Sequence, residues 1–182
     1  MDKNEIREVL EQHRLWMTVE GGKRASLRSA DLCGADLRGA DLRCANLSGA
    51  NMCGAEMCGA KLDNVKYNYC TSFFALQCPE EGSFIGYKKA SDYIVKLEIL
   101  PEAKRSSATS RKCRCSAAKV LSITTLDGKD DGTQSVSSGR DSGFVYRVGE
   151  IVRVDDFDEN RWNECSTGIH FLITRDEAVK YN

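Results

Sequence analysis

Eight consecutive five-residue units run from Arg24 to Asp63, and this short period constrains the fold more than any other feature of the chain. Each unit carries a large apolar residue at the same place and an alanine two residues earlier. The apolar column consists of Leu27, Leu32, Leu37, Leu42, Leu47, Met52, Met57 and Leu62. A period of five matches neither an α-helix nor a flat strand. It indicates a stacked repeat, in which each unit buries its apolar residue only against its neighbours.

Between the alanine and the large residue lies a polar residue, most often Asp or Asn, and glycine often ends the unit. Residues 30–39, with the sequence ADLCGADLRG, closely resemble the consensus of the pentapeptide-repeat family. The resemblance implies a right-handed, quadrilateral β-helix in which four units make one turn. Eight units then give about two coils, and residues twenty apart stack at roughly 4.8 Å. A stack this short exposes both ends unless other segments cover them.

Residues 1–23 are predicted to form an N-terminal capping helix. Asn4 is a suitable N-cap for a helix over residues 4–17. In such a helix Ile6, Val9, Leu10 and Met17 lie on one side and form an apolar face. We expect this helix to cover the first coil, with His13 as a packing residue.

Residues 24–78 are predicted to form the repeat domain and its closing segment, which is rich in aromatic residues. A simple cap needs less aromatic surface, so we predict a homodimer in which identical ends pair about a two-fold axis. The self-association residues would be Tyr67, Tyr69, Phe73 and Phe74. The alternative is a monomer in which the C-terminal domain folds back over them.

Residues 79–182 are predicted to form a small α+β domain after the boundary at Cys78-Pro79. Thr174 is expected to cap a short helix that ends near Tyr181. Two polar stretches, 102–112 and 127–143, are expected to be loops. Candidate strands cover residues 84–88, 93–100, 113–123, 144–148, 151–154 and 169–173.

Charge and cysteine content narrow the functional classes. The chain has no long apolar run and its N-terminus lacks the apolar stretch of a signal peptide, so we expect no membrane partner and a cytoplasmic location. The nine cysteines are then expected to be reduced.

The net charge differs between segments of the chain. The repeat block is neutral, residues 82–121 carry about +6, and residues 127–182 carry about −5. The two C-terminal segments therefore either face one another or present a basic surface to an anion or nucleic acid.

The densest group of distinctive residues is 157–171, which together with 103–107 and 112–114 resembles an uncharacterised domain found beside pentapeptide repeats in bacteriophage proteins. The resemblance suggests a phage origin. The candidate ligand or partner surface consists of Arg105, Arg111, Lys112, Arg114, Arg161, Trp162 and His170. The basic run suits phosphate contacts, but we favour its docking on the acidic stretch 155–159.

Three chemical readings compete with a purely structural role for these residues. Zinc is one candidate cofactor, with ligands Cys113, Cys115, Cys165 and His170. A Cys165–His170 pair is a candidate for nucleophilic chemistry. Residues 168–171 resemble the strand of ADP-ribosyltransferases that carries Gly-Ile-Tyr-Phe, although no catalytic glutamate is identified.

Together these features predict a non-enzymatic protein-interaction module, phage-encoded, that binds and modulates a host protein such as a defence factor. One alternative is a nucleotide-binding or ADP-ribosyltransferase-like C-terminal domain. The other is an inhibitor that mimics DNA, which the balanced charge of two short coils disfavours.

Overall fold

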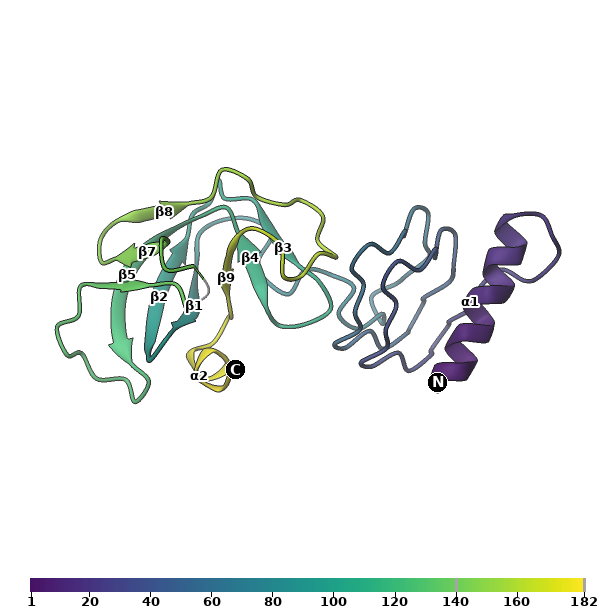
Figure 1. The fold of residues 1–182 in the computed structure, drawn as a ribbon, viewed down its shortest axis with the longest axis horizontal. Coiled ribbons are helices and arrows are strands. Elements are labelled where there is room, and N and C mark those ends of the chain that lie inside the picture. The colour runs from purple at the N-terminus through teal and green to yellow at the C-terminus, as the bar shows by residue number, and fades with distance from the viewer. Residues whose placement is uncertain (140, 182) are drawn as a thin grey trace. The chain divides into compact units, whose positions relative to one another are not determined.

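The structure, a computed structural model, describes residues 1–139 and 141–181, which form two compact units. The first unit contains residues 1–76 with two short later segments, 108–110 and 162–164. The second contains residues 77–107, 111–161 and 165–182. The chain as a whole is mainly β (Figure 1).

In the repeats, residues twenty apart pair as parallel β-bridges, from Ser26 with Asn46 to Asn46 with Lys66. The large residues and most of the alanines point inward and form one buried cluster. Between bridges the chain turns within each unit, as where Ala35 N donates to Leu32 O at 3.0 Å. That turn places Gly34 at a φ of +64°, a conformation that L side chains rarely adopt, which explains the glycines that end the units.

The stacking continues into a third, partial coil. Asn51 pairs with Ser72 rather than with residue 71, because one extra residue enters the coil at Thr71. The Thr71 hydroxyl donates to Leu47 O at 3.0 Å, which satisfies this buried group. The expected spacing of twenty therefore holds through residue 66 and then shifts by one.

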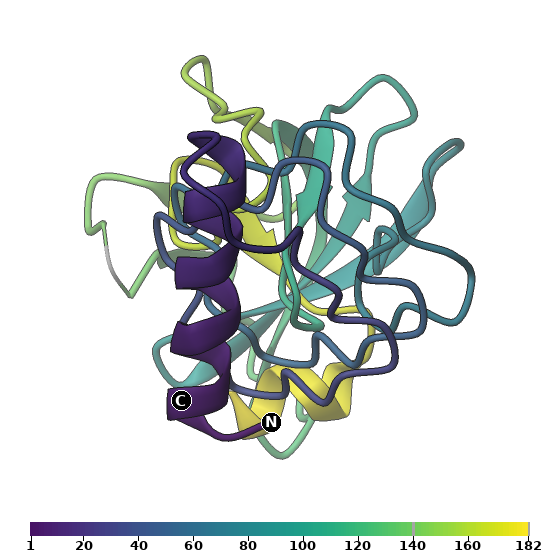
Figure 2. The ribbon, with the colours of Figure 1, turned by 90° about the vertical axis from the view of Figure 1, so that its right-hand side faces the viewer.

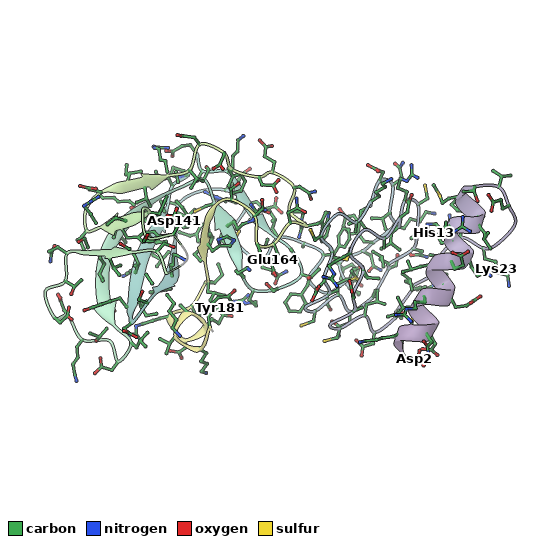
Figure 3. The ribbon with its side chains drawn as sticks, viewed as in Figure 1. Asp2, His13, Lys23, Asp141, Glu164 and Tyr181 are labelled. Carbon is green, nitrogen blue, oxygen red and sulfur yellow. The ribbon has the colours of Figure 1, made fainter. Side chains whose placement is uncertain are left out.

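Helix α1 (Lys3–Met17) lies beside the repeats, as Figures 1 and 2 show. Its residues Ile6, Val9 and Leu10 pack in the buried cluster of the repeats. Its N-cap is Asp2 and not the expected Asn4, because the Asp2 carboxylate accepts from the backbone of Asn4 and Glu5 and completes a capping box. His13 is fully buried (Figure 3). Ala25 N donates to its Nδ1 at 3.1 Å, so Nε2 carries the proton and donates to Arg43 O at 3.1 Å.

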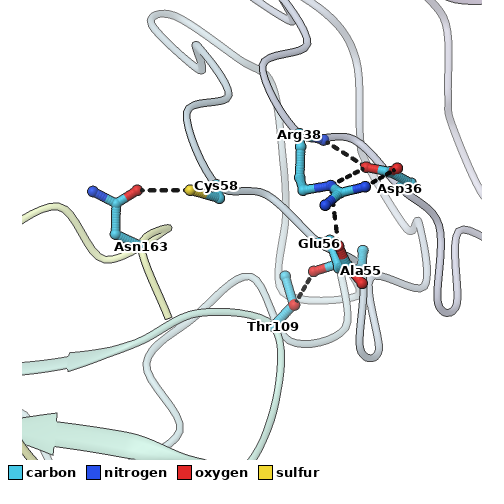
Figure 4. A network of polar contacts seen from close by, with 7 residues as sticks. All are labelled: Asp36, Arg38, Ala55, Glu56, Cys58, Thr109 and Asn163. Atoms are coloured by element: carbon cyan, nitrogen blue, oxygen red, sulfur yellow. Dashed lines mark hydrogen bonds and ion pairs between the residues drawn. The ribbon is translucent and has the colours of Figure 1, made fainter. Parts of the chain in front are cut away.

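The two later segments of the first unit contact the part of the second coil that the partial third coil leaves uncovered. Gly54 N donates to Thr109 O at 2.9 Å, and the Thr109 hydroxyl donates to Ala55 O (Figure 4). The Trp162 ring lies 5.4 Å from that of Phe74, which is buried. Residues 108–110 and 162–164 thus complete a core that the repeats begin.

The second unit is sheet-rich, and all of its strand pairs are antiparallel. The largest sheet has the order β1-β2-β5-β8, a second has the order β3-β4-β9, and β6 pairs with β7. The strands are β1 (Phe84–Ala90), β2 (Tyr93–Ile99), β3 (Arg105–Ser107), β4 (Cys113–Cys115), β5 (Ala117–Thr125), β6 (Ser135–Ser137), β7 (Val145–Arg147), β8 (Ile151–Arg153) and β9 (Ile169–Phe171). Helix α2 (Arg175–Lys180) begins after its N-cap Thr174, as expected.

Two features of this unit differ from the sequence-based expectation. The single strand expected over 113–123 is divided at Ser116, so β4 and β5 join different sheets. Strands β3 and β6 lie inside the two polar stretches expected to be loops, and each pairs with the next strand along the chain. Short polar strands carry no local pattern that distinguishes them from loops.

Candidate functional site

The second unit contains a pocket of about 770 Å³, a volume typical of sites for small molecules or peptide side chains. It is lined from β1, β7, β8, β9, the loop before β9 and the residue that follows α2; Figure 3 labels Asp141 and Tyr181 of its wall. Tyr87 and Leu172 hold two of these walls together, because each backbone N–H donates to the other's carbonyl at 2.8 Å.

The lining has more basic than acidic side chains. Four lysine and arginine side chains line the pocket, against two aspartates. The basic residues are Lys88, Lys89, Lys112 and Arg153, and the acidic ones are Asp141 and Asp156. Aromatic rings of Tyr87, Phe144, Tyr146 and Tyr181 contribute flat apolar surface. The site is therefore suited to an anionic ligand with an apolar part.

Lys112 is the most enclosed cation of the pocket. Only 9% of its surface is exposed. Its Nζ lies 3.3 Å from Cys165 Sγ and 6.0 Å from the centre of the Tyr181 ring. Lys89 has a different task, since its Nζ donates to Tyr181 O at 2.8 Å and so fixes the segment that follows α2.

Behind the pocket, Arg114 holds the loop that precedes β9. Its side chain is buried, and its guanidinium donates to the carbonyls of Thr167 at 2.6 Å, Asp158 at 3.0 Å and Asn160 at 3.1 Å. Gly168 has a φ of +146°, and a Cβ there would meet Arg114 Cβ at 3.2 Å. The glycine of the Gly-Ile-His-Phe segment is thus required by local packing.

The structure divides the seven candidate surface residues into different roles. Lys112 and His170 line the pocket. Arg105 donates to carbonyls, including Pro79 O at 3.0 Å, and Arg161 donates to Ser107 O at 2.9 Å. Arg111 pairs with Glu177 at 2.8 Å and lowers the pKa of that carboxyl. Arg114 is buried as described, and Trp162 packs on Phe74.

The contacts of the basic run with residues 155–159 include the hydrogen bond from Arg114 to the backbone carbonyl of Asp158. Lys104, which lies outside that run, pairs with Glu159. The basic run therefore does not form one continuous exposed patch, since Lys112 and Arg114 are buried.

The four candidate zinc ligands do not converge on one ion. Among residues 1–139 and 141–181, no group of three or more His, Cys, Asp or Glu side chains is arranged to hold a metal. Cys113 and Cys115 are buried in the sheet, whereas Cys165 is exposed. Burial raises the pKa of the Cys115 thiol to about 12.

The aromatic residues proposed for self-association are unequally exposed. Tyr69 is 99% exposed and Tyr67 is 57% exposed, whereas Phe74 lies between Tyr67 and Trp162. The chain itself thus covers part of this surface.

No local sequence pattern indicates that the pocket residues Tyr87, Lys88, Lys89, Arg153 and Tyr181 share a site with Lys112 and His170. They come from separate strands and from the residue after α2. The adjacent lysines Lys88 and Lys89 are the one local sequence feature that suggests an anion site. They reach the pocket because β1 pairs with the segment after β9.

No helix in the described part of the chain is long and apolar enough to cross a membrane.

The structure combines a first unit of stacked five-residue repeats with a sheet-rich second unit, and comparison with known families matches each part. Pentapeptide repeats match residues 23–64 in eight copies, which supports a protein-interaction module. A family model described as a family of unknown function (DUF5758) matches residues 74–178, more than half of the chain. The chain therefore belongs to that family. No curated protein and no solved structure matches the chain.

Proposed function

We propose that this protein is a non-enzymatic interaction module whose second unit binds an acidic segment of a partner protein in the pocket around Lys112. The repeats, wound as a right-handed, quadrilateral β-helix, are the rigid scaffold. The phage-like character of residues 157–171 favours a host protein, such as a defence factor, as the partner.

The observation that carries this proposal is the pocket itself, with its four basic side chains, its tyrosines and its enclosed Lys112. Carboxylates of an acidic segment would approach the basic side chains, and apolar side chains beside them would pack on the rings. Because Lys112 is buried, its charge is screened less than in water, and its attraction for a carboxylate of the partner is stronger.

The test uses a fluorescein-labelled hexaglutamate peptide and fluorescence anisotropy. Lys88→Glu and Arg153→Glu change partly or fully exposed residues, so both variants should fold. We expect each to weaken binding by about tenfold, the loss of one charge-assisted contact. Lys119→Glu is the matched control, because Lys119 is exposed on β5 outside the pocket lining. Equal weakening by all three variants would show nonspecific attraction and contradict the proposal.

A nucleotide-binding second unit is the alternative that the same pocket favours, because His170 lies in its lining and its volume suits such a ligand. Thermal unfolding in the presence of NAD and of cyclic nucleotides tests it. A rise in midpoint that disappears in His170→Ala would replace the peptide proposal with this one.

DNA mimicry ranks below both, since the repeat block has five basic and five acidic residues. A gyrase supercoiling assay without inhibition would remove it.

We retain the homodimer as a proposal that rests on the exposed Tyr67 and Tyr69. Light scattering at micromolar concentration tests it: a mass near the 20.2 kDa of one chain, unchanged by Phe73→Glu, would contradict it.

A further inference from the structure

Two cysteines occupy the same position on neighbouring coils of the repeats. Asp31 and Asn51 form a parallel bridge, and Cys33 and Cys53 each follow two residues later. The backbone pairing continues past them, since Leu32 N donates to Asn51 O and Gly34 N to Cys53 O, both at 2.9 Å. In-register positions on adjacent strands lie about 4.8 Å apart. The two thiols are therefore side by side.

The local geometry of the two positions is the same. Cys33 N donates to Asp31 Oδ1 at 3.1 Å, and Cys53 N donates to Asn51 Oδ1 at 3.2 Å. The Asn51 amide also donates to Asp31 Oδ1 at 3.1 Å and so joins the two turns. The side chains of Cys33 and Cys53 therefore leave the backbone in parallel directions, because equivalent hydrogen bonds fix the backbone at both positions.

Both thiols are free and reachable from solvent, since Cys33 is exposed and Cys53 is half-buried.

We propose that Cys33 and Cys53 form a two-thiolate site for a soft metal ion, with Cu(I) as the ligand. The coil spacing of about 4.8 Å lies within the Cα separation that a disulfide permits, but both thiols are free, so both sulfurs are available to a metal ion. A metal–thiolate bond is about 2.3 Å, so an ion midway between the sulfurs spans nearly the full spacing of about 4.8 Å. Thiolates select Cu(I) among the common ions. Binding releases two thiol protons, and no oxidation is involved.

Cys58 supplies the matched control for this site. It is an exposed repeat cysteine, and Gly39 N donates to Cys58 O in the same way as at the proposed site. Its counterpart one coil earlier is Arg38, which pairs with Asp36 and Glu56 (Figure 4). Cys58 thus has the exposure of Cys33 and no cysteine stacked below it.

The experiment is anaerobic competition for Cu(I) between the intact protein and bathocuproine disulfonate, with bound copper measured per chain. We expect Cys33→Ser and Cys53→Ser each to lose one equivalent of tightly held Cu(I), and Cys58→Ser to keep it. X-ray absorption of the wild-type complex should show two sulfur ligands. Retention of that equivalent in either of the first two variants, or its equal loss in Cys58→Ser, would overturn the proposal. Circular dichroism checks that all variants remain folded.

Discussion

The core of the first unit is a column of repeated leucine and alanine side chains, whereas the second unit combines an irregular apolar core with arginines that bind backbone carbonyls. Leu37 and its equivalents belong to one buried cluster that is formed mainly by the stacked repeats. Arg114 instead joins β4 to residues more than forty positions later in the sequence. The comparison teaches that a periodic core is specified locally, while an irregular loop needs one long, multidentate side chain to hold it.

The largest effect is expected where a charge enters the periodic column. Leu37 is 1% exposed, so Leu37→Asp places a carboxylate where no polar partner can reach it and should cost on the order of 4–5 kcal/mol. The first unit should lose its structure, as seen by circular dichroism and by rapid proteolysis. Arg28→Asp, at an exposed position of the same repeats, is the control. An unchanged spectrum for Leu37→Asp would refute the inward assignment.

Removal of Arg114 should weaken the second unit by nearly as much. Arg114→Met leaves three carbonyls without their donor and should lower the free energy of unfolding by about 3 kcal/mol or more. Arg114→Lys should recover little, because one ammonium cannot reproduce the planar fork. Denaturant unfolding measures both, with the exposed Arg147→Met as control. Full recovery by lysine would show that charge alone matters.

Cysteine labelling sharpens the comparison further. Cys33, Cys58 and Cys70 are exposed on the first unit, whereas Cys113 and Cys115 are buried in the second. Because burial raises the pKa of Cys115 to about 12, its thiol stays protonated at pH 8 and is a poor nucleophile. Iodoacetamide at pH 8 with peptide mass spectrometry should label the first group and spare the second until the protein unfolds. Uniform labelling would contradict this division.

The smallest effect is expected at the surface of the coils. Arg38 lies beside the stacked carboxylates of Asp36 and Glu56 and lowers the pKa of Asp36 to about 2 (Figure 4). A depressed pKa in the folded state contributes stability above the ordinary value of 3.8, and this contribution is lost as pH falls toward 2. The difference in stability between wild type and Arg38→Ala should therefore be small at neutral pH and vanish near pH 2. An NMR titration should place Asp36 higher in the variant.

The repeat register was predictable from sequence because each unit contains its own large apolar residue and alanine, and five of the eight contain a glycine. Most strands of the second unit were predictable as well, since Tyr93–Ile99 and Phe84–Ala90 carry enough apolar or β-branched residues. The pocket was not predictable, because Lys89, Arg153 and Tyr181 meet only after several strands have paired. Arg114 was misread as a surface residue, since a buried arginine and an exposed one look alike in a sequence.

The first unit is discontinuous along the chain, and this affects the order in which a growing polypeptide can fold. Residues 1–76 leave the ribosome first, yet the covering segment 162–164 is synthesised 88 residues after residue 76. At roughly 5–20 residues per second, the newly made coils exist for several seconds before Trp162 can pack on Phe74. The first unit therefore reaches its final packing only after most of the second unit has been synthesised.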